Sequence, residues 1–307
     1  MTRSSSRPGR PSGANPVAPG YYSARITTEA EAGMEPTIRW PQGKRCAVAL
    51  SFDLDGESPW IHRDPALAER PLHMSMGAYG PKTGAPRILK VLDRYDLKVA
   101  WFIPTWIVER YPDVCREIVR RGHEVGHHGH LHEKPFFLQG GAEEEEALLV
   151  KSLDIFKKVL DLRPRGSRLP SADPSKHSME LLKKHGFIYH SNLMDTDLPY
   201  CHKTQHGELV ELPTAWCNND WPFFGFSAVP PVGHGIWSQE DVFAIWKEEF
   251  EGAYDEGGFF NLMGHPQVVG RPSRMRMVSR LIEHILGKGD VWIARPIEIA
   301  EHYLAQR

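Results

Sequence analysis

Short apolar runs alternate along the chain with stretches of helical spacing. The run Ala47–Phe52 (AVALSF) predicts a buried strand that ends at Asp53, and Val99–Ile103 predicts a second strand that Pro104 terminates. Between these two runs, residues 86–95 carry apolar side chains at helical spacing. The order strand, helix, strand is typical of a βαβ unit.

The alternation continues to the C-terminal end. It predicts helices at Pro112–Arg121, Ala142–Leu160, Ser178–His185, Asp241–Phe250, Ser273–Leu286 and Ile297–Leu304, and strands at Glu124–Gly126, Phe187–His190, Leu209–Leu212, Phe259–Met263 and Val291–Ala294. Repeated units of this kind predict an α/β fold with a mostly parallel sheet, either open or closed into a barrel. We find no internal repeat and no linker, so we expect one domain over residues 38–307.

The first 37 residues differ from the rest in composition. They are rich in Arg, Ser, Pro and Gly and contain no apolar stretch of the kind that a secretory signal needs. We expect a disordered tail over residues 1–37 and a cytoplasmic location. No run of eighteen apolar residues occurs, so we expect no membrane span.

Charge and cysteine content narrow the classes of partner. The chain of 307 residues carries 37 basic and 39 acidic side chains, for a formal net charge of −2. This balance gives no electrostatic reason to expect nucleic acid or an anionic membrane as partner. The four cysteines form no C-x-x-C pair, so we expect four separate thiols.

Histidine is concentrated in one short segment. Five of the ten residues from His123 to His132 are histidine, out of sixteen in the whole chain. Neutral imidazole is the commonest protein ligand of transition metals, so the segment indicates a metal site. Gly126 and Gly129 disfavour a regular helix here, which predicts a loop, and the H-x-x-x-H spacing of His128 and His132 allows both to reach one ion.

Polar residues also follow two other predicted strands. Asp53 and Asp55 come after the first strand, and His265 follows Phe259–Met263. Because loops at the carboxyl ends of parallel strands meet at one edge of the sheet, we expect these side chains to lie near the histidine segment. One aspartate can complete a three-ligand catalytic metal site and the other can accept a proton from water, while His265 can protonate a leaving group. This set suits hydrolysis of an amide-like bond.

Each of these residues, taken alone, also has a purely structural interpretation. Asp55 precedes Gly56, and Asp-Gly is turn chemistry, while His127 and His130 could be solvated loop residues and His265 a packed residue at a strand end. Their occurrence together, in the order D-x-D, H-x-x-x-H, Arg, HP, favours the metal-dependent hydrolase.

Four ordered motifs carry a family resemblance. SFDLDGE, GHEVGHHGHLH, the SRLP around Arg168 and LMGHP resemble the motifs of the polysaccharide deacetylases, the NodB-homology or carbohydrate esterase family four, and the resemblance extends from about Ile38 to the C-terminus. It implies a distorted (β/α) barrel that binds one divalent metal ion, with zinc expected and iron, manganese or cobalt as alternatives. It also implies roles for individual residues: base, Asp53; metal ligands, Asp55, His128 and His132; orienting arginine, Arg168; acid, His265; aromatic wall, Trp216.

One departure from the usual motif points to a branch of the family. Leu54 separates two aspartates that are usually adjacent, and this spacing, with GRPSRM after His265 and the ending VWIARPIEIA, resembles peptidoglycan-deacetylase-like proteins, cyclic imide hydrolases and allantoinases. That branch implies homo-oligomers, commonly tetramers, and enclosed pockets. We therefore expect hydrolysis of a small cytosolic amide or cyclic imide. N-deacetylation of peptidoglycan or another N-acetylated glycan is the alternative, and allantoin is less favoured because the allantoinases lack this D-x-D.

Further residues are candidates for substrate contact. Glu57 and Trp60 lie just past the D-x-D and could line the same mouth. The aromatic-rich segment Trp216–Phe226 could be pocket wall, core or subunit contact.

Two other functional classes stay open at this point. Two histidines and one carboxylate also describe the facial triad of non-haem iron oxygenases, although those sites need neither the second aspartate nor a distant His265. A binding module that kept the fold without catalysis is the third class, and the complete set of base, ligands, arginine and acid argues against it.

Overall fold

The computed structural model describes residues 38–233 and 235–307, which lie in one compact unit. The predicted tail over residues 1–37 lies outside the described residues. The helices are α1 Ser58–Arg63, α2 Pro71–Tyr79, α3 Ala85–Arg94, α4 Thr105–Arg110, α5 Pro112–Arg120, α6 Gly141–Leu160, α7 Ser178–Lys184, α8 Trp221–Phe224, α9 Gln239–Asp255, α10 Pro272–Gly287 and α11 Pro296–Leu304. The strands are β1 Cys46–Asp53, β2 Ala100–Ile103, β3 Glu124–His127, β4 Gly166–Ser167, β5 Tyr189–His190, β6 Tyr200–Thr204, β7 Gly207–Glu211, β8 Ser227–Ala228, β9 Pro231–Val232, β10 Phe259–Gly264 and β11 Val291–Ile293.

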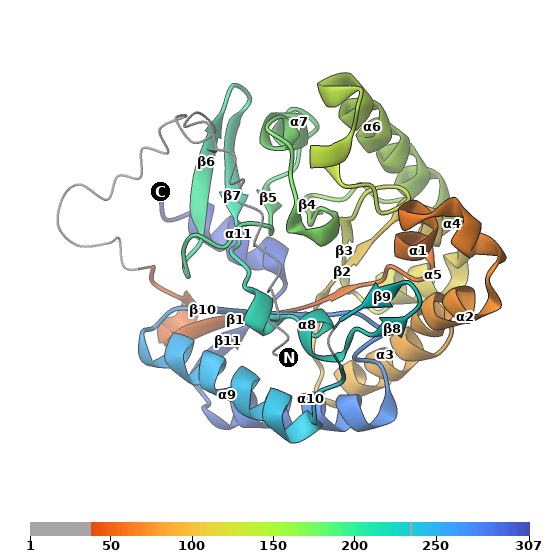
Figure 1. The fold of residues 1–307 in the computed structure, drawn as a ribbon. Helices are drawn as coiled ribbons and strands as arrows, with labels where there is room; N and C mark the ends of the chain where they lie inside the picture. Colours follow the sequence, from red (N-terminus) through yellow and green to blue (C-terminus); the bar gives the residue numbers. More distant parts are fainter. Residues whose placement is uncertain (1–37, 234) are drawn as a thin grey trace, which may run out of the picture. The chain divides into compact units, whose positions relative to one another are not determined.

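Nine strands form one curled sheet (Figure 1). Their order is β10-β1-β2-β3-β4-β5-β7-β6, with β11 also paired to β1, and every pair is parallel except β6 with β7. Over the described residues β10 and β6 do not pair, so the barrel is incomplete. The predicted α/β fold of the distorted-barrel type is confirmed.

Strand β1 explains why its sequence is apolar throughout. All eight of its residues are buried, because the sheet is covered on both faces. Ala47 and Ala49 belong to the inner cluster that includes Phe102, while Val48 and Leu50 pack with the covering helices. The alternation along β1 therefore places Asp53, like Ala47 and Ala49, on the inner face at the carboxyl end of the strand.

Most predicted elements lie within a few residues of their observed bounds, including the short strands β3 and β11, although α9 continues five residues beyond the predicted end at Phe250. Several other short elements were missed. The structure adds α1, α2 and α4, of six to nine residues each, and the antiparallel strand β6. These elements are too short to show a hydrophobic period, and tertiary contacts fix them.

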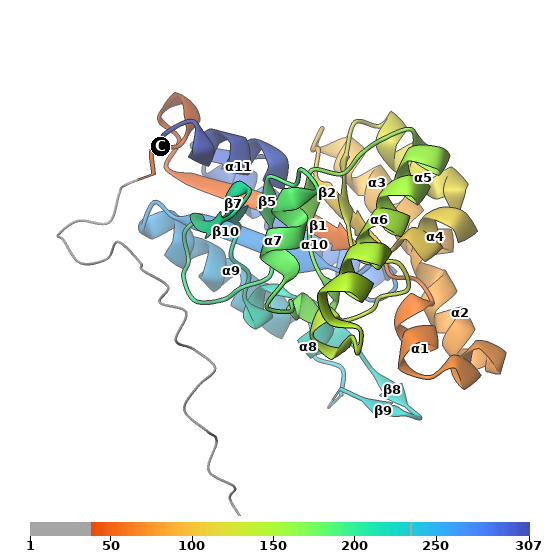
Figure 2. The same ribbon diagram turned by 90° about the horizontal axis from the view of Figure 1, so that it is seen from above.

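A two-stranded hairpin, β8–β9, lies apart from the main sheet and projects from the body (Figure 2). His73 of α2 hydrogen-bonds to the carbonyl oxygen of Val229 in the turn of this hairpin. The bond joins the hairpin to the α1–α2 region, on the same side of the molecule.

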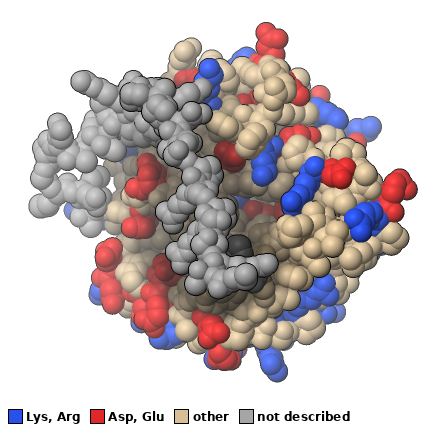
Figure 3. Space-filling model, viewed as in Figure 1, with Lys and Arg blue, Asp and Glu red and all other residues tan. Residues whose placement is uncertain are grey.

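Basic and acidic side chains are mixed over the visible surface in Figure 3. No helix in the described part of the chain is long and apolar enough to cross a bilayer. All four cysteines lie within that part, and all four are free thiols, as predicted.

Candidate metal centre and active site

The predicted residues meet at the carboxyl ends of β1, β3 and β10. Asp53 is the last residue of β1, His128 follows β3 and His265 follows β10. Residues 128–132 form an irregular loop, as predicted from Gly126 and Gly129. The candidate base, acid, arginine and three metal ligands all line one cavity of about 510 Å³.

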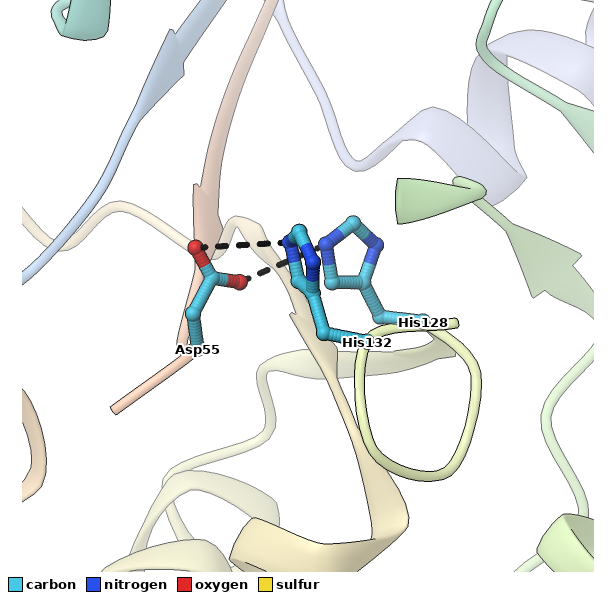
Figure 4. A group of neighbouring side chains, drawn as sticks. All are labelled: Asp55, His128 and His132. Carbon is cyan, nitrogen blue, oxygen red and sulfur yellow. Dashed lines mark ion pairs between the residues drawn. The ribbon is translucent and has the colours of Figure 1, made fainter. Parts of the chain in front are cut away.

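Asp55, His128 and His132 form a compact group of ligand atoms (Figure 4). Asp55 Oδ1 lies 3.3 Å from His128 Nε2, and Asp55 Oδ2 lies 4.0 Å from His132 Nε2. Ligand atoms around a tetrahedral zinc ion lie about 3.3 Å apart for bonds of about 2.0–2.1 Å. Asp55 Oδ1 is buried and has no hydrogen-bond partner, which is costly unless a cation satisfies it. The residues present therefore fit a divalent ion.

The backbone sets the orientation of both imidazoles. His128 Nδ1 lies 2.6 Å from the carbonyl oxygen of Arg168 and must donate to it, which leaves Nε2 of the neutral ring free as a ligand. His132 adopts φ of 64°, the left-handed conformation, so the loop turns sharply at this residue. Burial lowers the pKa of His132 to about 3, which keeps the ring in the neutral, metal-binding form.

Asp53 is held by a buried ion pair. Arg168 Nη1 donates to Asp53 Oδ1 at 2.9 Å, and the arginine side chain is 1% exposed. Arg168 also donates to the hydroxyls of Ser51 and Ser191, and its guanidinium lies 4.4 Å above the ring of Phe102. These contacts fix one carboxylate oxygen and leave Asp53 Oδ2 directed toward the cavity, 3.9 Å from His265 Nε2.

His265 has its own carboxylate partner, which sequence reasoning missed. Asp220 Oδ1 lies 2.6 Å from His265 Nδ1, and Asp220 Oδ2 accepts the backbone N–H of His265. Burial acts to lower the pKa of His265, but Asp220, with Asp55 and Asp53, raises it to about 9. The Nε2–H of the cationic ring therefore faces the cavity, as a proton donor would.

The turn that carries His265 is packed so closely that the neighbouring positions Gly84 and Gly270 have no room for a side chain. A Cβ atom at Gly84 would lie 2.1 Å from the carbonyl oxygen of Pro266, and one at Gly270 would lie 2.3 Å from the same oxygen. Gln267, in the same turn, donates to Asp55 Oδ2 at 3.2 Å. The turn thus connects the candidate acid to a candidate metal ligand.

Trp60 and Trp216 line the cavity, and Glu57 does not. Glu57 is buried and accepts a hydrogen bond from the hydroxyl of Tyr111 at 2.5 Å. Trp216 is 53% exposed, so its indole stands at the mouth of the cavity. Among the three residues expected at the mouth, the two tryptophans are there and the glutamate lies behind the wall.

The aromatic segment divides between two environments. Trp216 and Trp221 line the cavity, and Trp221 packs edge-on against His265 with ring centroids 5.3 Å apart. Phe223 and Phe224 belong to the hydrophobic core, and Phe226 is exposed. Asp220 lies inside this segment and is fully buried, and no local sequence pattern indicates its contact with His265.

The other three histidines of the segment point away from the cavity. His123 accepts a backbone N–H, His127 lies 3.1 Å from the Ser167 hydroxyl, and His130 lies 2.9 Å from the Thr105 hydroxyl. Burial lowers the pKa of His127 to about 3. These rings support the loop, and two of the five imidazoles face the candidate ion.

The fold and the gathered side chains are those of a distorted-barrel hydrolase scaffold. The polysaccharide deacetylase family model matches residues 78–190. A peptidoglycan deacetylase of Helicobacter pylori is 31% identical over 288 residues, which cover 85% of this chain and 97% of that protein. The chain therefore belongs to the polysaccharide deacetylase family.

Solved structures agree with this assignment. A "putative polysaccharide deacetylase" from Mycobacterium smegmatis superposes with a TM-score of 0.86 at 37% identity, covering 90% of this chain and 96% of that one. Puue allantoinase superposes with a TM-score of 0.79 at 23% identity, covering 93% and 98%, which shows a shared fold.

Proposed function

We propose that the protein hydrolyses an amide or imide C–N bond of a compact substrate, with one divalent metal ion held by Asp55, His128 and His132. The proposal rests on one observation: two carboxylates with different surroundings line the same cavity. Asp55 faces the two imidazoles, and Asp53 is paired with Arg168. Zinc is the ion we expect, with iron, manganese or cobalt as alternatives.

The cation, when bound, would polarise the substrate carbonyl and make the attacking water more acidic. Asp53 Oδ2 is the free oxygen that accepts the proton of that water, because Arg168 occupies Oδ1. While the water oxygen forms its bond to the carbonyl carbon, the ion pair with Arg168 holds the Asp53 carboxylate in position. We assign Asp53 as base and Arg168 as the residue that positions it.

His265 Nε2 supplies the second proton transfer. Asp220 holds Nδ1, so the other nitrogen faces the cavity, 3.7 Å from Asp55 Oδ2. When the C–N bond breaks, the leaving nitrogen takes the Nε2 proton. A linear amide then releases a neutral amine, whereas a cyclic imide opens to an acid that keeps the nitrogen as its own amide. Asp53 thus acts as the base and His265 as the acid of one reaction. The water supplies the oxygen of the new C–O bond, and the proton that it gives to Asp53 balances the proton that His265 gives to the leaving nitrogen.

The cavity supports a compact substrate. A volume of about 510 Å³ is in the range of small-molecule pockets. Trp60, Trp216 and Trp221 give it an aromatic wall suited to flat amide or imide groups. We therefore favour a small amide or cyclic imide.

N-deacetylation of a glycan is the second candidate, and the relatives favour it. The Helicobacter pylori relative, which this chain matches over nearly its whole length, is a peptidoglycan deacetylase. An N-acetylglucosamine unit carries the same amide bond and would fit the same cavity with its neighbours outside.

A hydrolysis panel separates these candidates. Metal-analysed protein is assayed with succinimide, glutarimide, dihydropyrimidines, hydantoins and allantoin, and with N-acetylglucosamine and muropeptide oligomers. We expect turnover of an imide or small amide. Acetate release from the oligomers, with no turnover of imides or ureides, would move the assignment to glycan deacetylation. Oxygen consumption with iron and a co-substrate, and no hydrolysis, would support the oxidative alternative.

The proposal includes a homo-oligomer, which the family branch implies. Phe136 and Phe137 are exposed with ring centroids 5.2 Å apart, and Phe137 also lines the cavity, so a subunit contact at this place would lie beside the cavity. Mass photometry tests this point, and a monomer at micromolar concentration would remove it. Cell fractionation tests the expected cytoplasmic location.

A further inference from the structure

A second group of metal-binding side chains lies outside the active site. His190, His202 and Glu211 each offer one ligand atom, and the three atoms lie within 4.8 Å of one another. We propose that these residues form a second, structural site for a zinc-type divalent cation. The proposal goes beyond the proposed function, since the catalytic chemistry makes no use of this group.

Three neighbouring strands bring the group together. Glu211 of β7 is the register partner of His190 on β5 and of Tyr200 on β6, and His202 lies two residues further along β6 on the same face. An ion bound by this group would therefore link the ends of three strands that are otherwise joined by few backbone pairs. β5 contributes only two residues to the sheet.

The group lies on the face of the sheet opposite to the one that leads into the catalytic cavity. Tyr189 and Val210 belong to the inner cluster with Phe102. Their neighbours His190 and Glu211 point the other way, toward the face where Leu209 packs against helices α6 and α7. The two candidate metal sites are thus separated by the sheet itself.

Over the described residues, the buried carboxyl group of Glu211 has no lysine or arginine partner. Its side chain is 0% exposed, and over the described residues its ion-pair contacts are two imidazoles: His190 Nδ1 at 3.0 Å and His202 Nε2 at 3.8 Å. The backbone N–H of Asn192 satisfies Oε1, whereas Oε2 has no hydrogen bond. A buried carboxylate ordinarily requires a cationic or hydrogen-bonded partner, and this oxygen lacks one.

The imidazoles show the same deficit. His190 Nε2 and His202 Nε2 are buried and have no hydrogen-bond partner. The ring centroids lie 5.0 Å apart and the ring planes are tilted by 36°, so the rings do not stack face to face. His190 Nδ1, the ring nitrogen 3.0 Å from Glu211 Oε2, also lies 2.8 Å from the side-chain amide nitrogen of Asn192. A cation would use the orphaned carboxylate oxygen, His202 Nε2 and one nitrogen of His190, and binding through Nδ1 would replace the Asn192 contact.

The ligand types identify the class of ion. Two imidazole nitrogens and one carboxylate oxygen form a set that zinc and its neighbours, cobalt and nickel, bind readily, whereas calcium and magnesium prefer oxygen alone. The His202 side chain is 21% exposed, so the ion can enter from solvent and water can complete its coordination.

Metal stoichiometry tests the proposal. Full-length protein is stripped with a chelator, incubated with excess Zn²⁺, desalted and measured by mass spectrometry of the metal. We expect about two ions per chain in the wild type, about one in Asp55→Asn and in His202→Ala, and almost none in the double variant. The matched control is His206→Ala, an exposed histidine in the β6–β7 turn, which should keep both ions.

Thermal melting gives a second measurement. Zn²⁺ should raise the Tm of Asp55→Asn by several degrees and leave the double variant unchanged, because an ion that binds only the folded chain stabilises it. One ion in the wild type and none in Asp55→Asn would overturn the second site. This result does not depend on any substitution of His190, His202 or Glu211. One ion that persists in Asp55→Asn and disappears in His202→Ala would support it and refute the catalytic metal centre instead.

Discussion

Asp53→Asn separates the base from the metal ligands. Asparagine keeps the shape of the side chain and can still offer an oxygen to Arg168 Nη1, which now lies 2.9 Å from the carboxylate. The group that replaces Oδ2 is an amide NH₂, which cannot accept a proton. We expect the variant to keep its metal and lose turnover.

The size of the loss follows from the chemistry of the removed group. General-base catalysis contributes about 10²–10⁴-fold, so the barrier should rise by about 3–5 kcal/mol. The variant also leaves Arg168 without its counter-charge at a position that is 1% exposed. Because the hydrogen bonds to Ser51 and Ser191 remain, we expect a stability loss of about 1–3 kcal/mol, below that of an unpaired buried charge.

Three measurements are made on the same preparation: kcat on the best substrate of the panel, metal per chain, and Tm. Asp154→Asn, the same substitution at an exposed position of α6, serves as the matched control and should change none of them. Wild-type turnover in Asp53→Asn would refute the assignment of the base. Loss of metal together with rate would show that Asp53 is a ligand.

The remaining predictions concern the ligands, a buried acid and the cavity wall. Asp55→Ala and His128→Ala should each lose the catalytic ion and activity together and keep only the ion of the second site, and a variant that keeps its metal at wild-type occupancy would contradict the ligand assignment. Burial raises the pKa of Glu124 from 4.5 to about 7, although Tyr189 donates to it, so the folded state holds this proton more tightly than the unfolded state. Stability should therefore fall as pH rises from about 4.5 to about 7, by at most about 3 kcal/mol. Glu124→Gln should reduce this dependence in melts between pH 5 and pH 8 and leave the share from Glu211, whose pKa burial also raises to about 7. An unchanged slope would exclude Glu124 as a source. Trp216→Ala should raise KM by about 2–12-fold with kcat little changed, as expected for loss of one aromatic contact, and an unaltered KM would remove Trp216 from the binding wall.

The sequence predicted the elements whose pattern is long. Eight buried residues of β1 and the helical spacing of α3 are local properties, and both elements appeared where the pattern placed them. Five of the six candidate catalytic and ligand residues were found from their motifs and because strand ends in an α/β sheet share one edge. The sixth, Arg168, was found only through the family resemblance. Their roles stay predictions until the variants are made.

What the sequence did not reveal depends on contacts distant along the chain. Asp220 lies 45 positions before His265, and nothing in the local pattern marks the pair. Glu57 is close to the D-x-D in sequence, yet the turn at Gly56, with φ of 56°, directs it to Tyr111. The group of His190, His202 and Glu211 depends on the register of β5, β6 and β7, which no periodicity specifies.

Arg168 contacts both a candidate metal ligand and the candidate base, through different atoms. Its carbonyl oxygen fixes the ring of His128, and its guanidinium fixes the carboxylate of Asp53. A displacement of this one residue therefore moves a metal ligand and the base together, so the two cannot be adjusted independently by substitutions near it. A double-mutant cycle between Arg168→Lys and Asp53→Asn should be strongly non-additive, because lysine cannot reproduce the fork of contacts that arginine makes. Substitutions intended to change substrate preference are better placed at the cavity mouth, because Trp216 forms no hydrogen bond with either His128 or Asp53.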